Sequence, residues 1–191
     1  MASNLEAPIV GGGSVFTLGD GSAVTLRELR DEDRAMLERF IDKLSEDTIY
    51  FRFLASGINR EVIIDQLSPR PGAYTLVAVE GGEIVGHVAY FKSQSEAAEI
   101  GILIMDAYQG KGLGTRLIET IARAANANGV TMFEAIIDWN NTRMIRMVRS
   151  IGFPTSEKVE PDLIRIRFPT SIDPVSIGEF QEKWVFSPDC K

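Results

Sequence analysis

Glu99 and the glycine-rich run that follows it are the residues whose types and spacing could do chemistry in this sequence. The stretch 97–114 reads AAEIGILIMDAYQGKGLG. Glycines let successive backbone N–H groups face one ligand, and the N-terminus of a following helix adds unsatisfied donors and the positive end of its dipole. The run from Gln109 to Gly114 is therefore predicted to bind a phosphate or pyrophosphate, with Lys111 adding charge at the rim.

A strand before this run and a helix after it would hold it in place. Ile100, Ile102 and Ile104 alternate along the chain, which is typical of a largely buried strand. Downstream, apolar residues recur at helical spacing, at Leu117, Ile118, Ile121, Ala124 and Ala125. Gly129 is the expected stop of that helix.

The spacing of the glycines separates the known types of phosphate loop. The sequence has no G-x-x-x-x-G-K-[ST] run, and the G-x-G-x-x-G pattern fails because position 115 is Thr. The spacing that fits is Q-x-x-G-x-G, formed by Gln109, Gly112 and Gly114. A tight strand-to-helix turn without any ligand is the alternative.

The rest of the chain reads as strands and helices in a mixed order. Alternating apolar residues predict strands at 15–18, 24–29, 74–79, 84–91, 130–137 and 163–168, besides the one before the glycine run. Helical spacing predicts helices at 31–44, capped by Asp31, and at 45–53, 59–67 and 142–150. The first two strands form one predicted hairpin, and Gly81-Gly82 turns another.

Length, charge and cysteine usage exclude several classes of protein. A chain of 191 residues predicts one domain, and its net charge of −7 argues against non-specific binding of nucleic acid. The only cysteine, Cys190, fits a reducing compartment, and no secretory signal or membrane span is apparent. We therefore expect a cytoplasmic protein with no nucleic-acid or membrane partner.

Metal and triad chemistry also find little support in the sequence. No His/Cys cluster has metal-ligand spacing, so no metal cofactor is expected. His87 is the only histidine, and no G-x-S-x-G elbow exists. We interpret His87 as a buried strand residue with one hydrogen bond.

Four phrases carry a family resemblance. They are VTLRELRDED, LSEDTIYFRF, AEIGILIMDAYQGKGLG and NTRMIRMVRSIGF. Together with Q-x-x-G-x-G and the order of elements, they resemble the GCN5-related N-acetyltransferases (GNAT), and more narrowly the acetyltransferase domain of Pat-type protein lysine acetyltransferases. The resemblance covers roughly 23–168. It implies an α/β (α+β) fold: a mixed, mostly antiparallel sheet flanked by helices, with splayed central parallel strands.

The resemblance and the composition of the two ends together predict a domain organisation. The acetyltransferase domain would span 14–168, after a flexible tail at 1–13. Residues 169–191 would form an extension that docks on the domain, since exposed Trp184 and Phe186 would be unfavourable. A contact with a partner is the alternative for this extension.

The resemblance places acetyl-CoA on three parts of the chain. Main-chain groups of Leu103 and Ile104 would bond the pantetheine arm. Asn141 would bond the cofactor from the start of the next helix. The pyrophosphate would lie on the loop residues Gln109, Gly110, Lys111, Gly112, Leu113 and Gly114. Three arginines of that helix either reach the phosphates or form a solvated face, and we favour the solvated face: Arg143, Arg146 and Arg149.

Glu99 is the expected catalytic base. It matches the glutamate of the Pat-like A-E-x-x segment, and desolvation inside an apolar strand would strengthen it as a base. A freed backbone N–H near Ile104 is the expected oxyanion donor. A glutamate paired with an arginine is the alternative for Glu99. Many family members carry a Tyr general acid where this chain has Val148, so water or another donor would have to protonate the leaving thiolate.

These features predict an acetyl-CoA-dependent N-acetyltransferase that acts on an amine, with the side chain of a protein lysine as the expected acceptor. Groove walls would come from 45–53 and from the hairpin after Val159. A small or N-terminal amine is the alternative acceptor. A non-catalytic acyl-CoA sensor, in which Glu99 is structural, is the alternative from another class.

Overall fold

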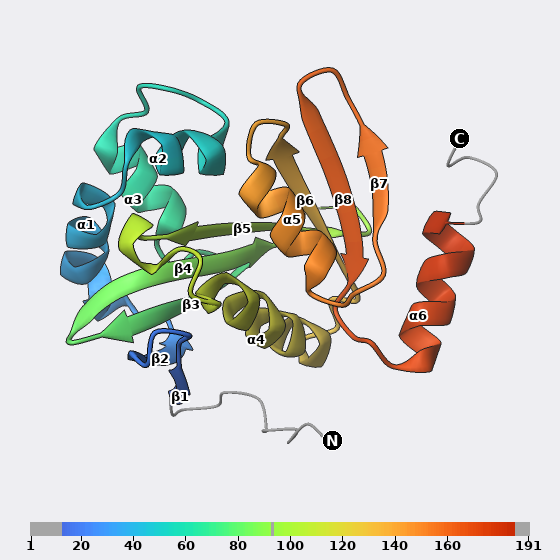
Figure 1. The fold of residues 1–191 in the computed structure, drawn as a ribbon, viewed down its shortest axis with the longest axis horizontal. Coiled ribbons are helices and arrows are strands. Elements are labelled where there is room, and N and C mark those ends of the chain that lie inside the picture. The colour runs from blue at the N-terminus through green and yellow to red at the C-terminus, as the bar shows by residue number, and fades with distance from the viewer. Residues whose placement is uncertain (1–12, 93, 186–191) are drawn as a thin grey trace.

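An eight-stranded sheet runs through the part of the chain that the structure describes (Figure 1). The structure is a computed structural model that describes residues 13–92 and 94–185. Strand order is β1-β2-β3-β4-β5-β6-β8-β7, and every neighbouring pair is antiparallel except β5 and β6. This is the predicted fold class, a mostly antiparallel sheet with one central parallel pair.

The strands fall close to their predicted positions. They span Ser14–Thr17 (β1), Ala23–Glu28 (β2), Ala73–Glu80 (β3), Glu83–Phe91 (β4), Ala98–Ile104 (β5), Met132–Asp138 (β6), Ser156–Val159 (β7) and Leu163–Pro169 (β8). The sequence analysis did not identify β7. Its residues are mostly exposed and lack apolar alternation, so it is defined by its pairing with β8.

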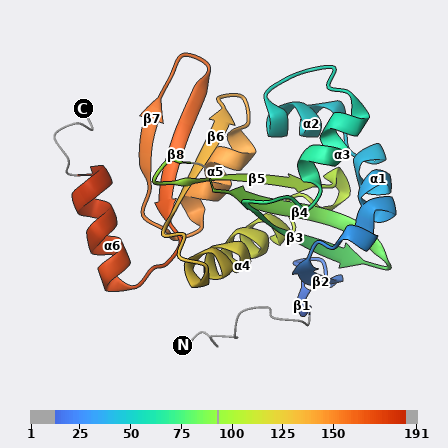
Figure 2. The ribbon, with the colours of Figure 1, turned by 180° about the vertical axis from the view of Figure 1, so that it is seen from behind.

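The helices cover both faces of the sheet (Figures 1 and 2). They span Arg34–Asp42 (α1), Glu46–Phe53 (α2), Arg60–Leu67 (α3), Leu113–Ala127 (α4), Thr142–Ser150 (α5) and Pro174–Phe180 (α6). Short 3-10 turns lie at Asp31–Asp33 and Asp106–Tyr108, and a π-helical segment spans Gln181–Val185. No helix in the described ranges is long and apolar enough to span a membrane.

Local capping explains where several helices begin. Ser45 accepts the N–H of Thr48 at the start of α2, and Asn59 accepts that of Glu61 at the start of α3. The prediction that Asp31 caps the first helix is wrong. The chain makes a 3-10 turn there because the Asp33 carboxylate bonds back to the N–H of Arg30, and the α-helix begins only at Arg34.

Two apolar clusters form on opposite faces of the sheet because successive strand residues point to opposite sides. One cluster joins the sheet to α4 and α5, and the other joins it to α1 and α3. On α4 the residues Leu117, Ile118 and Ile121 are fully buried. Each contributes roughly 1.5–3 kcal/mol of stabilisation, which fixes the helix that follows the glycine run.

The extension after β8 also contacts the sheet. Phe180 of α6 is buried with Ala97 and Met132 in a small cluster of its own. The side chains of Trp184 and Phe186, the terminal Cys190 and most of the predicted tail at 1–13 lie outside the described residues.

The parallel pair opens soon after it forms. The register between β5 and β6 holds only at Ala98 with Phe133 and at Glu99 with Glu134. On its other side, β5 stays paired with β4 up to Ile104. The β6-facing edge of β5 beyond Glu99 therefore has no strand partner among the described residues. This is the predicted splay.

Candidate active site

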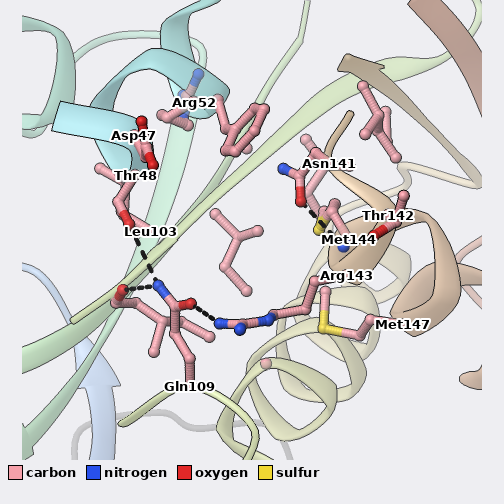
Figure 3. A pocket seen from close by; sticks show the side chains of 18 of the residues that line it. Asp47, Thr48, Arg52, Leu103, Gln109, Asn141, Thr142, Arg143, Met144 and Met147 are labelled. Carbon is pink, nitrogen blue, oxygen red and sulfur yellow. Dashed lines mark hydrogen bonds between the residues drawn. The ribbon is translucent and has the colours of Figure 1, made fainter. Parts of the chain in front are cut away.

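A cavity of about 1210 Å³ occupies the opening between β5 and β6 (Figure 3). β5 contributes Glu99 to Ile104, and β6 contributes Ala135 to Ile137. The glycine loop and the start of α5 close one end, and α2 forms a further wall. The expected wall from 45–53 is present. The expected wall from the hairpin after Val159 is wrong, because β8 and β7 lie beyond β6 and line no part of this cavity.

The glycine loop has the geometry of an anion site. Gly110 and Gly112 have φ of 76° and 88°, and Gly112 is the N-cap of α4. A Cβ added at either glycine would meet nothing within 4 Å, so the backbone there is open to a ligand. Within the described residues, no side chain caps α4. Its first N–H groups remain available, as the strand–glycine–helix pattern predicted.

Gly114 and Leu113 serve the loop differently from what was expected. The helix begins at Leu113, whose side chain is buried. A Cβ on Gly114 would lie 2.5 Å from Sδ of Met147, so this glycine lets α4 approach α5 closely. These two residues position the loop through packing; Gly114 also lines the cavity, whereas Leu113 does not.

Lys111 does not stand free at the rim. Its ammonium forms an ion pair with Asp20 at 2.7 Å and lies 5.0 Å from the ring centre of Tyr108. Hydrogen bonds from Lys111 and Ser22 lower the pKa of Asp20. The lysine is absent from the cavity lining. It therefore ties the loop to the β1–β2 turn, because a carboxylate far away in sequence neutralises it.

Gln109 joins three walls of the cavity, as Figure 3 shows. Its side-chain amide donates to the carbonyl of Ile104 at 3.0 Å and to Oγ1 of Thr48 at 3.3 Å. Its carbonyl oxygen accepts a hydrogen bond from Arg143. The Ile104 carbonyl, expected to be free for the cofactor, thus already has one partner. Gln109 fixes β5, α2 and α5 relative to the loop.

A second set of hydrogen bonds holds α2 over the cavity. The carboxylate of Asp106 accepts from the hydroxyls of Ser45 and Thr48 and from the Ser45 N–H. Desolvation opposes the effect, but these hydrogen bonds lower the pKa of Asp106. Tyr50 donates to Asp138 at 3.0 Å, which connects α2 to the end of β6 and raises the tyrosine pKa. The two anchors set the separation of the walls.

Asn141 lies where the resemblance placed it, at the start of α5. Its side-chain oxygen accepts the N–H of Met144 at 3.1 Å and caps the helix. Its amide nitrogen points toward β5 in Figure 3 and has no partner among the described residues. That N–H₂ group remains available to a ligand.

The three arginines of α5 divide between the two expected roles. Arg149 forms an ion pair with Glu157, with bonds of 2.8 and 2.6 Å, and does not line the cavity. Arg143 and Arg146 line the cavity beside the glycine loop. Both side chains are also exposed, as expected of a solvated face, and their positive charges lie at the end of the cavity beside the glycine loop.

Glu99 lies at the point where β5 and β6 part. Its side chain is exposed, which differs from the expected desolvation because the opening of the strands admits solvent. It makes no ion pair or hydrogen bond within the described residues, so it does not have the arginine partner of the alternative interpretation. An exposed, unpaired carboxylate at the cavity edge is free to accept a proton.

Besides Glu99, the carboxylates of Asp47 and Asp106 line this cavity, and other common proton-transferring side chains are absent from its described lining. None of its described lining residues is Tyr, His or Cys. Val148, at the position of the family's Tyr, is buried in the core. His87 is fully buried, and its Nε2 bonds the carbonyl of Leu67 at 3.1 Å, as predicted. Burial lowers the pKa of His87 to about 4.

Sequence reasoning missed Arg52, which also lines the cavity. The spacing of Ser45, Thr48 and Arg52 places all three on one face of α2. That spacing could have identified Arg52. It was not considered, because attention went to the apolar residues of the same segment, which were assigned to the core or groove wall.

A sheet whose parallel pair opens around a glycine loop defines a class of proteins, the acetyl-CoA-dependent N-acetyltransferases. Residues 28–153 match the acetyltransferase (GNAT) family. The chain belongs to this family.

Individual relatives agree with this class. An acetyltransferase of Pseudomonas aeruginosa is 31% identical over 159 residues, which are 79% of this chain and 86% of that protein. The thialysine N-epsilon-acetyltransferase of Mus musculus is 26% identical over 148 residues, 69% of this chain and 84% of that protein. The crystal structure of the GNAT domain of S. lividans PAT superposes with a TM-score of 0.76 and 25% identity, covering 86% of this chain and 99% of that one.

The described residues fit the acetyl-CoA that GNAT acetyltransferases use. Gly110 and Gly112 form an open cradle for a pyrophosphate, and α4 offers uncapped N–H groups beside it. The unpartnered edge of β5 offers main-chain groups of the kind that a pantetheine arm bonds. Within the described ranges, no cluster of acidic, histidine or cysteine side chains could hold a metal ion.

Proposed function

We propose that this protein transfers an acetyl group to the side-chain amine of a lysine on another protein, with Glu99 as the general base. Acetyl-CoA supplies the acetyl group as an activated thioester. The observation that carries the proposal is the exposed, unpaired carboxylate of Glu99 at the edge of the cavity. A lysine on a protein surface can reach a base that is itself at the surface. The resemblance of the sequence to Pat-type protein lysine acetyltransferases supports the same acceptor.

Acid–base chemistry explains why this carboxylate is needed. A lysine amine has a pKa near 10.4, so at neutral pH it is an ammonium and cannot attack a carbonyl carbon. A positioned base that removes the proton accelerates such a step by about 10²–10⁴-fold. Glu99, directly or through one water, takes that proton. The main chain near Ile104 is the proposed oxyanion donor, and solvent protonates the leaving thiolate, since Val148 cannot.

The cofactor contacts are part of the same proposal. The loop from Gln109 to Gly114 holds the pyrophosphate through its backbone, and Asn141 donates from its free amide nitrogen. Arg143 and Arg146 add positive charge at that end. Lys111 is left out of this set because Asp20 neutralises it.

A small amine is the second candidate acceptor, and one observation favours it. The murine relative is named for thialysine, a free amino acid, and it aligns over 69% of this chain. The same carboxylate and the same loop would serve either acceptor.

Acetyl-CoA is expected to raise the melting temperature of the protein. A ligand that binds only the native state stabilises it by RT ln(1 + [L]/Kd), about 2.7 kcal/mol at a hundredfold excess over Kd. Differential scanning fluorimetry at millimolar acetyl-CoA measures this directly. NADH and ATP serve as controls, and a shift with either one but none with acetyl-CoA would contradict the assignment of the loop.

Labelled acetyl-CoA is expected to mark lysine side chains when it is incubated with this protein and a whole-cell protein extract. Mass spectrometry of the products locates the label, and an extract incubated without the enzyme gives the background. Rapid acetylation of small amines without any labelled protein would contradict the lysine acceptor. Binding of acetyl-CoA without turnover on any acceptor would leave only the sensor.

A further inference from the structure

Arg52 of α2 lines the cavity in a position that requires a glycine beneath it, at residue 101 of β5. A Cβ added to Gly101 of β5 would lie 2.5 Å from Nη2 of Arg52 and closer still to Cζ. The guanidinium therefore rests directly on the backbone of β5. Gly101 and Glu99 are two positions apart in this strand, so the guanidinium lies on the sheet face that also carries Glu99. Figure 3 shows Arg52 on α2, beside the opening.

The guanidinium lacks the partners that an arginine in such a place normally has. Its Nε atom is buried and makes no hydrogen bond. No carboxylate in the described residues lies within ion-pair distance, although Asp47 and Glu99 line the same cavity. The ring of Phe53 lies 5.0 Å from Cζ. A half-buried guanidinium without a counter-ion is unfavourable, and an incoming anion would remove the penalty.

The surrounding charges show which ligand would suit this place. Burial lowers the pKa of Arg52, the carboxylate of Glu99 partly offsets this, and Arg70 adds to the decrease. One positive and one negative group thus face the same end of the cavity. Gly101, on which the guanidinium rests, lies roughly 7 Å along β5 from Glu99, about the length of an extended lysine side chain. The cofactor phosphates are expected at the other end, beside Arg143 and Arg146.

We propose that Arg52 binds a carboxylate of the acceptor while Glu99 faces its amine. This inference rests on the proposed transfer to an amine and defines the acceptor further: it carries a carboxylate about one lysine side chain away from the reacting nitrogen. The carboxylate belongs either to a free amino acid or to an acidic residue beside the target lysine in a protein. The guanidinium can bond it through two parallel N–H groups.

Paired acceptors that differ in one carboxylate test this inference. The first pair is L-lysine and L-lysinamide. The second pair is a blocked peptide with Glu beside the lysine and the same peptide with Gln. Release of CoA gives kcat/KM for each probe, and the melting temperature of the CoA-saturated protein gives binding, so that a probe that is not acetylated is still measured.

In the wild-type protein, kcat/KM for the acid of at least one pair is expected to exceed kcat/KM for its amide by roughly 10–100-fold, the effect of a hydrogen bond to a charged group. In Arg52→Gln the ratio is expected to fall toward one. Gly101→Ala should also lower the ratio, because its Cβ displaces the guanidinium while every charge is kept. Arg70→Gln is the matched control, since Arg70 is exposed and lines no part of the cavity. It should keep the ratio.

The outcomes separate the two proposals. A preference in the lysine pair alone identifies a free amino acid as the acceptor, and a preference in the peptide pair identifies an acidic context in a protein. Equal values for acid and amide in both pairs overturn the inference, even where protein lysines are labelled. A ratio that survives in both Arg52→Gln and Gly101→Ala also overturns it. A carboxylate preference without any labelled protein supports Arg52 and contradicts the lysine acceptor.

Discussion

Glu99→Gln is expected to lower turnover per folded molecule by about 10²–10⁴-fold. Glutamine keeps the shape and much of the hydrogen-bonding capacity of glutamate, but it cannot take a proton from the acceptor ammonium. Acetyl-CoA affinity should change little, because Glu99 lies far from the glycine loop: the distance along β5 from Glu99 to Ile104, just before the loop, is about 17 Å. The measurements are kcat/KM for the acceptor and the acetyl-CoA-dependent shift in melting temperature.

The pH dependence distinguishes a lost base from a lost structural contact. As pH rises, more of the acceptor amine is already neutral, so the activity of Glu99→Gln should recover toward that of the wild type. Glu134→Gln is the matched control. Glu134 is the register partner of Glu99, but it forms ion pairs with Arg165 and Arg167, so its loss should reduce stability. Equal turnover of wild type and Glu99→Gln near neutral pH would remove Glu99 from the mechanism.

Gly112→Glu is expected to weaken acetyl-CoA binding by about 100-fold or more. The new side chain would fill the open space beside the backbone and bring a negative charge to the place of the pyrophosphate. Two like charges 4 Å apart repel by about 4 kcal/mol at an effective dielectric constant of 20. Isothermal titration with acetyl-CoA measures the change.

Gly112→Ala is the control for backbone strain. Gly112 has φ of 88°, so any side chain costs about 1–2 kcal/mol there and both variants should lose similar stability. Alanine adds no charge and meets no neighbouring atom, so it should retain much more affinity than glutamate. If folded Gly112→Glu binds acetyl-CoA as tightly as Gly112→Ala, the loop is only a turn.

Local signals predicted most of the regular structure. In strands such as β3 and β4, apolar residues alternate with polar ones or follow one another. Capping residues such as Ser45 and Asn141 mark where helices begin. These signals act between residues a few positions apart, so a single sequence contains them. The short strand β7 and the helix α6 were missed because neither has a strong apolar period; β7 is defined by its pairing with β8, and α6 by the contact of Phe180 with Ala97 and Met132.

The glycine loop and its helix were likewise predicted from the sequence. Glycine permits positive φ, and it has no side chain that could cap the N-terminus of a helix. The state of the charged residues around the loop and its helix was not predicted. Lys111 is neutralised by Asp20, Arg143 bonds Gln109, and Glu99 is exposed although its strand reads as buried. Each outcome depends on how another element lies beside the residue.

The sequence by itself thus determined the family, the order of the elements and the position of the glycine loop, since periodicity, caps and glycines are local properties of the chain. Only the tertiary structure decided which side chains share the cavity. Packing lays Arg52 of α2 on Gly101 of β5 and sets Met147 of α5 against Gly114 of α4. Such contacts join residues that are far apart in the sequence, and all four residues line the cavity between β5 and β6.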